Sequence, residues 1–104
     1  MNPLKPCLKT YMRTIERTGK FRRDYRREAK TYGREQLDDA LITVLRDLCL
    51  DQPLAAKYED HPLSGEWSNH LDCHIKPDLI LIYQKPDQDT LRLVRLGSHS
   101  ELSL

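Results

Sequence analysis

The sequence predicts an α+β domain in which two N-terminal helices pack on one face of a small, antiparallel-rich sheet. Three observations support this prediction. Two stretches with helical periodicity occupy the first half of the chain, three stretches of strand character follow one another in the second half, and a turn signal separates the last two of these. The expected order of elements is strand, helix, helix, strand, strand, strand, within a single domain spanning residues 1–104.

The N-terminal part is expected to begin without regular structure. Residues 1–11 contain two prolines and no periodicity, so we expect a loose N-terminal extension, and Met12 could equally be the start of the protein. Residues 12–18 alternate well enough to predict a short strand with Ile15 pointing inward.

Two amphipathic helices are expected next. A helix from Gly19 places the aromatic residues Phe21, Tyr25 and Tyr32 on one face. The opposite face is basic and consists of Arg22, Arg23, Arg26, Arg27 and Lys30. Gly33 is well placed to end this helix. Four apolar residues then recur at helical spacing and predict a second helix ending near Pro53, namely Leu37, Leu41, Val44 and Leu48.

The remaining strands are predicted from alternation and from apolar runs. Residues 54–70 have no clear period and carry turn residues, so we expect a loop with at most a short strand. Residues 71–76 alternate, with Leu71, Cys73 and Ile75 on one face and Asp72, His74 and Lys76 on the other. Residues 79–83 are apolar on both faces, as in a central strand covered on both sides. Residues 85–89 form a turn into the last strand, residues 90–96.

The composition is that of an ordinary globular domain, with 38% hydrophobic and 32% charged residues. No apolar run approaches the roughly 20 residues that a membrane span needs, and the N-terminus has no apolar segment of a secretion signal. Cys7, Cys49 and Cys73 are too few and too scattered for a disulfide framework. We therefore expect a cytoplasmic protein with reduced thiols and no membrane partner.

Charge is divided unevenly along the chain. Residues 1–34 hold eleven Lys and Arg against three acidic residues, whereas residues 35–104 hold six against thirteen. Such asymmetry is typical of contact with nucleic acid or with an acidic protein, although a basic helix can also be merely solvated.

The histidines concentrate in the half of the chain that is predicted to form the sheet. Because strand ends and adjoining loops converge above a sheet, His61, His74, Asp78 and His99 could meet at one site. Histidine titrates at about pH 6.5, so one imidazole can accept a proton while another donates one. Cleavage of RNA needs such a pair, and it needs no metal.

A cation is also needed to stabilise charge on the phosphorane, and Arg95 or Arg92 is the candidate. An alternative interpretation of the histidine cluster is a zinc site, with ligands from His70, Cys73 and His74 together with His61 or Asp72. This stretch contains neither a paired CxxC nor an HExxH motif. Trp67 could pack under the loop or stack on a base, and Cys73 is expected in the core.

Three motifs carry a family resemblance, which extends from about Met12 to the C-terminus. The stretches DHPLSGEW, DCHIKPD and RLGSHSEL, in this order and spacing, resemble the YafQ branch of the RelE/ParE superfamily of bacterial type II toxins. The resemblance implies a RelE-like fold and an mRNA interferase that cuts mRNA in the ribosomal A site without a metal cofactor. It also implies a cognate antitoxin protein as partner, beside the ribosome and mRNA.

Site residues can be carried over position by position. The family's catalytic residues correspond to His61, His74, Asp78 and His99, and Asp72 and Arg95 correspond to supporting positions. Trp67 and the basic helix face remain as candidates for contact with RNA or the ribosome. Two departures bear on substrate stacking and codon preference: Ser103 and Leu79 stand where relatives commonly have an aromatic residue.

Two other functions compete with the ribosome-dependent endoribonuclease. One is a ParE-like toxin that binds and inhibits DNA gyrase, and the other is a nucleic-acid-binding module that uses the arginine-rich helix. Neither requires a convergent set of His61, His74, Asp78 and His99, so these residues favour the nuclease.

Overall fold

A computed structural model describes residues 12–104 of the protein, so the predicted extension over residues 1–11 lies outside the described residues. The main elements are β1 (Thr14–Arg17), α1 (Gly19–Tyr32), α2 (Arg34–Cys49), β2 (His61–Pro62), β3 (Leu71–Lys76), β4 (Leu79–Gln84), β5 (Thr90–Gly97) and α3 (His99–Leu102). Two short 3₁₀ turns, η1 (Ala56–Tyr58) and η2 (Gly65–Trp67), interrupt the predicted loop. The α+β prediction is therefore confirmed. β2 is the short strand allowed for in the loop, and α3 is added to the prediction.

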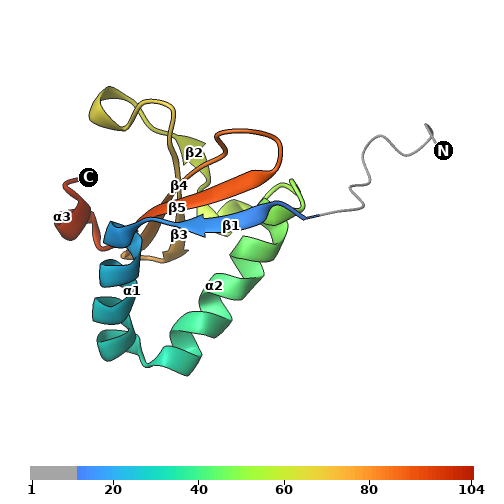
Figure 1. The fold of residues 1–104 in the computed structure, drawn as a ribbon. Helices are drawn as coiled ribbons and strands as arrows, with labels where there is room; N and C mark the ends of the chain where they lie inside the picture. Colours follow the sequence, from blue (N-terminus) through green and yellow to red (C-terminus); the bar gives the residue numbers. More distant parts are fainter. Residues whose placement is uncertain (1–11) are drawn as a thin grey trace.

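The strands form one sheet in the order β1-β5-β4-β3-β2 (Figure 1). Three of the four pairings are antiparallel, and only β1 lies parallel to its neighbour β5. The N-terminal strand is thus held by the last strand of the chain, and α1 and α2 lie together on one face of the sheet.

Local signals explain where the helices begin and end. The Thr18 side chain accepts a hydrogen bond from the Phe21 N–H and caps the start of α1. Gly33 has a φ of 87°, in the left-handed region that favours glycine, and it separates the two helices. The predicted start and end of the first helix are confirmed. Within residues 12–104, no helix is long and apolar enough to cross a membrane.

The larger of two hydrophobic clusters lies between the helices and the sheet. Phe21 is buried there, with Tyr25 and Tyr32 packed against it, as the sequence predicts. The apolar positions of α2 are buried as predicted, namely Leu37, Leu41, Val44 and Leu48.

A smaller cluster lies on the opposite face of the sheet. Its buried members are Ile80, Ile82 and Leu102, with Leu63, Trp67 and Val94 packed against them. Because β4 contributes Leu79, Leu81 and Tyr83 to the first cluster and Ile80 and Ile82 to the second, it is the central strand covered on both sides that the sequence predicts.

Two register shifts change which face a side chain takes. In β5, Arg95 pairs with Ile82 and Leu93 pairs with Tyr83, so Val94 is an extra residue in a β-bulge. Simple alternation would place Arg95 on the side of Leu93, whereas the bulge places it beside Ile82, on the face that carries the predicted site.

The second shift lies in β3, and it corrects one prediction. Lys76 was expected on the face of Asp72 and His74, but the register changes between His74 and Lys76. The Lys76 ammonium group instead lies 5.5 Å from the centre of the Tyr32 ring, toward the helices. The predicted alternation of β3 is therefore wrong at its last residue.

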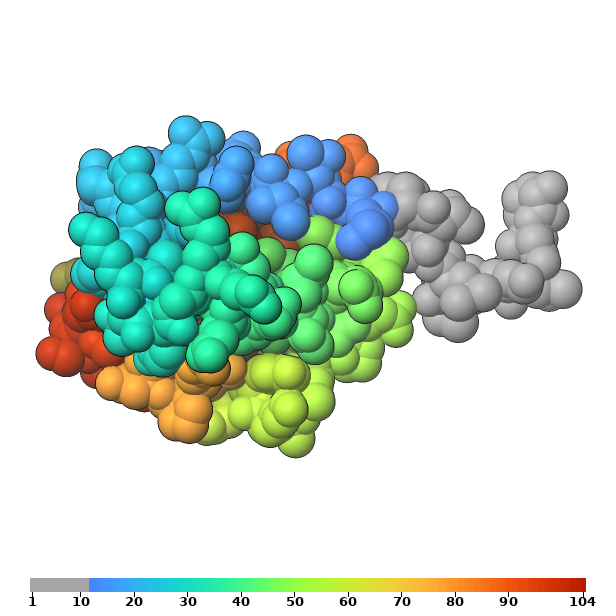
Figure 2. Space-filling model, turned by 90° about the horizontal axis from the view of Figure 1, so that it is seen from below, coloured from blue at the N-terminus to red at the C-terminus, as the bar shows by residue number. Residues whose placement is uncertain are grey.

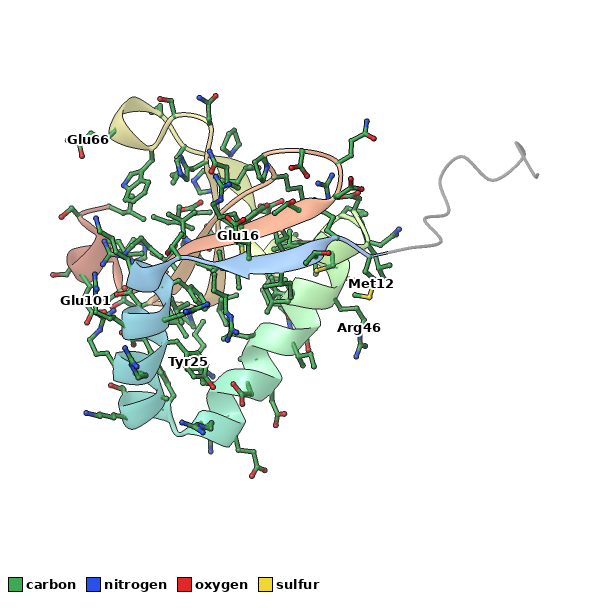
Figure 3. All side chains as sticks on the ribbon, in the orientation of Figure 1. Met12, Glu16, Tyr25, Arg46, Glu66 and Glu101 are labelled. Carbon is green, nitrogen blue, oxygen red and sulfur yellow. The ribbon has the colours of Figure 1, made fainter. Side chains whose placement is uncertain are left out.

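Ile15 takes the predicted inward side, since it pairs with the core residue Leu91, but it is not buried: all of β1 is exposed, and 41% of the Ile15 surface remains accessible. Ile15 lines an open groove between β1, α1 and α2, together with Ile42. Figure 2 shows this hollow between the blue β1 and α1 and the green part of α2. Figure 3 labels three further lining residues, Met12, Tyr25 and Arg46.

Candidate active site

The register of the sheet brings the predicted catalytic residues to one face. His61 of β2 pairs with Asp72 of β3, and His74 lies two residues further along the same strand. Asp78 lies in the turn between β3 and β4, and His99 is the first residue of α3. The predicted convergence therefore occurs because the short β2, the β3–β4 turn and α3 meet at this side of the sheet.

His99 and Asp78 form the most direct contact of the site. The Nδ1 atom of His99 lies 2.7 Å from Oδ1 of Asp78, and the backbone N–H of His99 donates to the same oxygen at 3.0 Å. These two bonds from His99 lower the pKa of the Asp78 carboxyl. An ionised carboxylate only accepts hydrogen bonds, so Nδ1 carries a proton and Nε2 is the atom of His99 that can exchange one.

His74 lies beside His99, and the two rings meet in a T-shaped arrangement. The two ring centres are 5.3 Å apart and the rings are inclined at 84°. The Nδ1 atom of His74 also lies 3.4 Å from Oε2 of Glu59, and only 15% of the His74 side chain is exposed. The site thus contains two neighbouring imidazoles, each beside its own carboxylate, which is the composition that general acid-base catalysis requires.

His61 and Asp72 form the second half of the site. Nδ1 of His61 lies 2.7 Å from the Glu59 carbonyl oxygen and 3.1 Å from Oδ1 of Asp72. A carbonyl oxygen accepts, so the Nδ1 proton points to Glu59, and within the described residues Oδ1 of Asp72 has no hydrogen bond. Burial raises the pKa of Asp72, although His61 and His74 oppose this effect.

Arg95 reaches this face through the bulge, but its guanidinium group is already paired. Its Nε atom lies 2.7 Å from Oδ2 of the buried Asp24, and a second nitrogen lies 3.3 Å from Oδ1. Burial alone would raise the pKa of Asp24, but bonds from Arg95, the Leu96 N–H and Arg27 outweigh it and lower that pKa. Arg92, the other candidate cation, bonds to Glu16 and Gln84 instead.

The residues predicted to contact RNA differ in how exposed they are. Arg22, Arg23, Arg26 and Lys30 are exposed along α1. Arg27 is only partly exposed, because it bonds to groups on α1, β5 and α3. Trp67 packs against the smaller hydrophobic cluster, and the centres of its ring and of the His70 ring are 5.3 Å apart.

The alternative zinc site does not assemble. Cys73 is buried in the cluster under the helices, whereas His74 lies on the other face of β3. Across residues 12–104, no group of three or more histidine, cysteine or acidic side chains is arranged to hold a metal ion. Burial also raises the pKa of the Cys73 thiol, which fits its predicted role as a core residue.

Three residues that organise this site escape the sequence prediction, namely Asp24, Glu28 and Glu101. Asp24 and Glu28 are buried on α1, at the same helical spacing as Phe21 and Tyr32. The sequence signal that could have identified them is the presence of two acidic residues on the helix face that otherwise carries the aromatic core residues. For Glu101, the signal was the S-x-x-E pattern of a capping box beginning at Ser98, which the structure contains.

Comparison with known proteins defines the class, a small bacterial toxin. Residues 13–104 match a family model described as bacterial toxin of type II toxin-antitoxin system, YafQ. The mRNA interferase toxin YafQ of Escherichia coli K12 is 39% identical over 90 residues, which cover 86% of this chain and 95% of the relative. The chain therefore belongs to the YafQ family, and the resemblance seen in its motifs is confirmed.

Solved structures agree with this assignment. A metal-bound toxin from Helicobacter pylori is 48% identical and has a TM-score of 0.78, over 88% of this chain and 99% of that one. YafQ in the E. coli DinJ-YafQ toxin-antitoxin complex is 37% identical and has a TM-score of 0.71, over 88% and 97% of the two chains. The RelE-like fold predicted from the sequence is thereby confirmed.

Proposed function

We propose that the chain is an endoribonuclease that cuts mRNA on translating ribosomes, and so inhibits translation, with His61, His74, Asp78 and His99 as its catalytic set. The observation that carries this proposal is the contact of the two imidazoles, His74 and His99, with Asp78 holding the second one. Membership in a toxin family that includes an mRNA interferase supports the reaction class.

The roles of the two imidazoles follow from their partners. His74 takes the proton from the 2′-OH as that oxygen attacks the phosphorus atom, and His99 gives a proton to the 5′-oxygen as its bond to phosphorus breaks. Asp78 is a poor base, because the bonds from His99 lower its pKa, and it instead orients His99 and stabilises its charged form. The products are a 2′,3′-cyclic phosphate and a 5′-hydroxyl.

Two further groups support the reaction. Arg95 lies on the same face and supplies positive charge for the phosphorane. Asp72 lies 3.1 Å from Nδ1 of His61 and stabilises that imidazole in its charged form. Both residues are carried over as supporting positions from the family motifs, and the pairing of Asp72 with His61 and of Arg95 with Ile82 supports these roles.

Binding partners follow from charge and from the family. The exposed basic residues of α1, Arg22, Arg23, Arg26 and Lys30, are proposed to contact ribosomal RNA phosphates. Arg27 is engaged within the fold, and Trp67 is proposed to lie beside the bound RNA. A cognate antitoxin is proposed to neutralise the toxin, as the E. coli relative is found in a complex with DinJ.

The test is cleavage of mRNA on purified ribosomes, with His99→Ala as the control. In a second condition the toxin is treated with EDTA and then freed of it before the assay, because the ribosomes themselves need Mg²⁺. We expect cuts in ribosome-bound mRNA only, at an unchanged rate with the EDTA-treated toxin, and a rate lower by about 10²- to 10⁴-fold with the control variant. Inhibition of DNA gyrase without any mRNA cleavage would replace this proposal with the ParE-like alternative. Loss of cleavage after the EDTA treatment that zinc alone restores would overturn the metal-free mechanism.

A further inference from the structure

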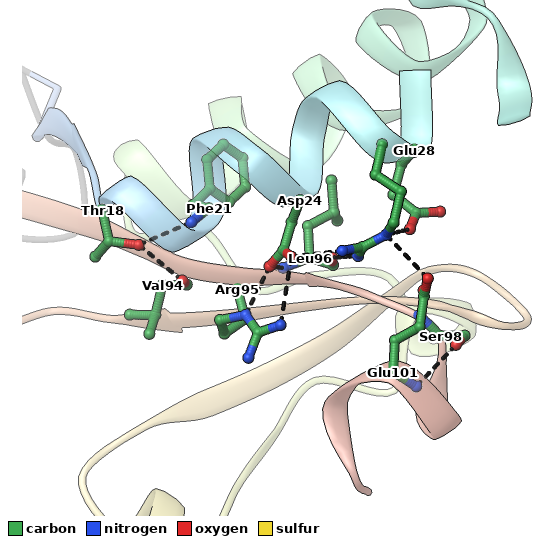
Figure 4. Close-up of polar contacts among 10 residues, drawn as sticks. Thr18, Phe21, Asp24, Glu28, Val94, Arg95, Leu96, Ser98 and Glu101 are labelled. Atoms are coloured by element: carbon green, nitrogen blue, oxygen red, sulfur yellow. Dashed lines mark hydrogen bonds and ion pairs between the residues drawn. The ribbon is translucent and has the colours of Figure 1, made fainter. Parts of the chain in front are cut away.

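Helix α1 covers the part of β5 that extends beyond β1. Here α1 side chains bond to the free edge of β5 (Figure 4): Oγ1 of Thr18 donates to the Val94 carbonyl at 2.8 Å, and Oδ2 of Asp24 accepts from the Leu96 N–H at 3.0 Å. The Leu96 carbonyl accepts from Arg27 at 2.9 Å. Side chains thus satisfy backbone groups that a further strand would otherwise bind.

Arg27 then connects this edge to α3. Its Nε atom lies 2.9 Å from Oε2 of Glu101, while another of its nitrogens lies 2.9 Å from Oδ1 of Asp24. It also contacts Oε2 of Glu28 at 2.9 Å, so one guanidinium group contacts three carboxyl groups. Arg27 is therefore the point at which α1, β5 and α3 are joined.

Glu101 transmits this connection to the start of α3. Its Oε1 atom accepts from the Ser98 N–H at 2.8 Å, and its own N–H donates to the Ser98 hydroxyl at 3.0 Å. This reciprocal capping box fixes the backbone immediately before His99. The next N–H along the chain is that of His99, which donates to Asp78.

The contact leaves little room for a side chain at Gly97. A Cβ atom there would lie 3.0 Å from a terminal nitrogen of Arg27 and 3.1 Å from Oε1 of Glu101. Glycine at this position therefore lets Arg27 and Glu101 close over the end of β5, directly before the capping box.

From these contacts we propose that Arg27 is a positioning residue for His99, acting through Glu101 and the capping box at Ser98. The role of Arg27 thus differs from that of its neighbour Arg26, which is exposed on the same helix. The proposal rests on the ribosome-dependent cleavage proposed above, because it concerns the placement of the residue that donates the proton in that reaction.

The kinetic test compares Arg27→Gln with Arg26→Gln, two neighbouring changes that remove the same charge. We expect Arg27→Gln to lower kcat by about 10- to 100-fold with little change in KM for mRNA-programmed ribosomes, since small misplacement of a catalytic group is enough for such a loss. Arg26→Gln should chiefly raise KM, because it weakens ribosome binding. If Arg27→Gln raises KM and leaves kcat unchanged, Arg27 is a ribosome contact and the proposal is overturned.

A second measurement uses the free protein and does not depend on any cleavage activity. In Glu101→Gln the amide can still cap Ser98, but the charge that pairs with Arg27 is lost. In both Arg27→Gln and Glu101→Gln we expect the NMR signal of the His99 amide to shift and the pKa of Asp78 to rise toward its ordinary value, because the bond between these residues loosens. Unchanged His99 and Asp78 signals in variants whose core signals show a native fold would overturn the proposal. If the two variants show these NMR changes but the parent protein cuts no mRNA, the proposed nuclease function is wrong, whereas the positioning of His99 by Arg27 still holds.

Discussion

The two faces of the sheet differ in what they bury. Within residues 12–104, the face under α1 and α2 holds a cluster of fourteen buried residues, all apolar or aromatic apart from its two cysteines, whereas the cluster on the opposite face has three buried apolar residues. The sparsely covered face carries the titrating groups and a buried carboxylate, Asp72, with an oxygen that lacks a hydrogen bond in the described part of the chain. We therefore expect stability to depend mainly on one face and the proposed cleavage on the other, so substitutions should separate the two properties.

The largest effect on the chemical face is expected from His99→Ala. The side chain is 45% exposed and bonds to an exposed aspartate, so its loss removes a proton donor without removing core packing. We expect the rate of ribosome-dependent cleavage to fall by about 10²- to 10⁴-fold. The melting temperature should stay close to that of the parent, and a large drop in it would show that the two faces are not separable.

Leu81→Ala tests the other face. Leu81 is fully buried in the cluster under the helices, and its replacement leaves a cavity. We expect the free energy of unfolding to fall by about 2–5 kcal/mol, measured by urea titration. At temperatures where the variant remains folded, kcat should match that of the parent. A large fall in kcat under those conditions would link the core directly to catalysis.

Asp72→Asn is expected to have opposite effects on stability and activity. Burial raises the pKa of Asp72 in the folded protein, so the charged carboxylate destabilises the fold above that raised pKa and has no such effect below its unfolded value of 3.8. The variant should therefore gain about 1 kcal/mol near neutral pH and lose this advantage as the pH falls toward 4. Cleavage should decrease, because His61 loses its anionic partner. If the variant and the parent are equally stable at pH 7, the surrounding groups offset the cost of burying the Asp72 charge more fully than its contacts indicate.

The smallest effect is expected from Ser103→Phe. Ser103 is exposed at the end of α3 with a φ of 59°, a left-handed conformation that costs a phenylalanine about 1 kcal/mol. The added ring can stack on a base of the mRNA, which is worth about 1–3 kcal/mol per base. We expect faster cleavage or a changed codon preference, with an unaltered pH profile. If rate and codon pattern both equal those of the parent, position 103 does not contact the substrate.

The sequence predicts this fold well because most of its signals are local. Gly33 ends a helix, Leu37 to Leu48 repeat at helical spacing, and residues 79–83 are apolar throughout. The site was predictable to the extent that residue types at strand ends indicated chemistry, as for His74 and His99.

The remaining features depend on contacts between distant segments. The bulge at Val94, which places Arg95 on the chemical face, leaves no sign in the alternation of residues 90–96. The pairing of Asp24 with Arg95 joins residues that lie far apart in the chain. Alternation predicts the side of the strand on which Ile15 lies, but it does not show whether that side is covered. β1 is an edge strand, and nothing in the described chain covers it fully.

The parallel pairing of β1 with β5 also affects when the protein can fold. Thr14 pairs with Thr90 and Arg17 with Leu93, so the first strand waits for the last one to be synthesised. Contacts between segments so far apart slow folding, and a bacterial or eukaryotic ribosome adds only about 5–20 residues per second. A nascent chain that ends before β5 has neither the partner of β1 nor the edge that α1 covers. We therefore expect catalytic competence to arise only after nearly the whole chain has been made, which delays the onset of activity relative to the start of synthesis.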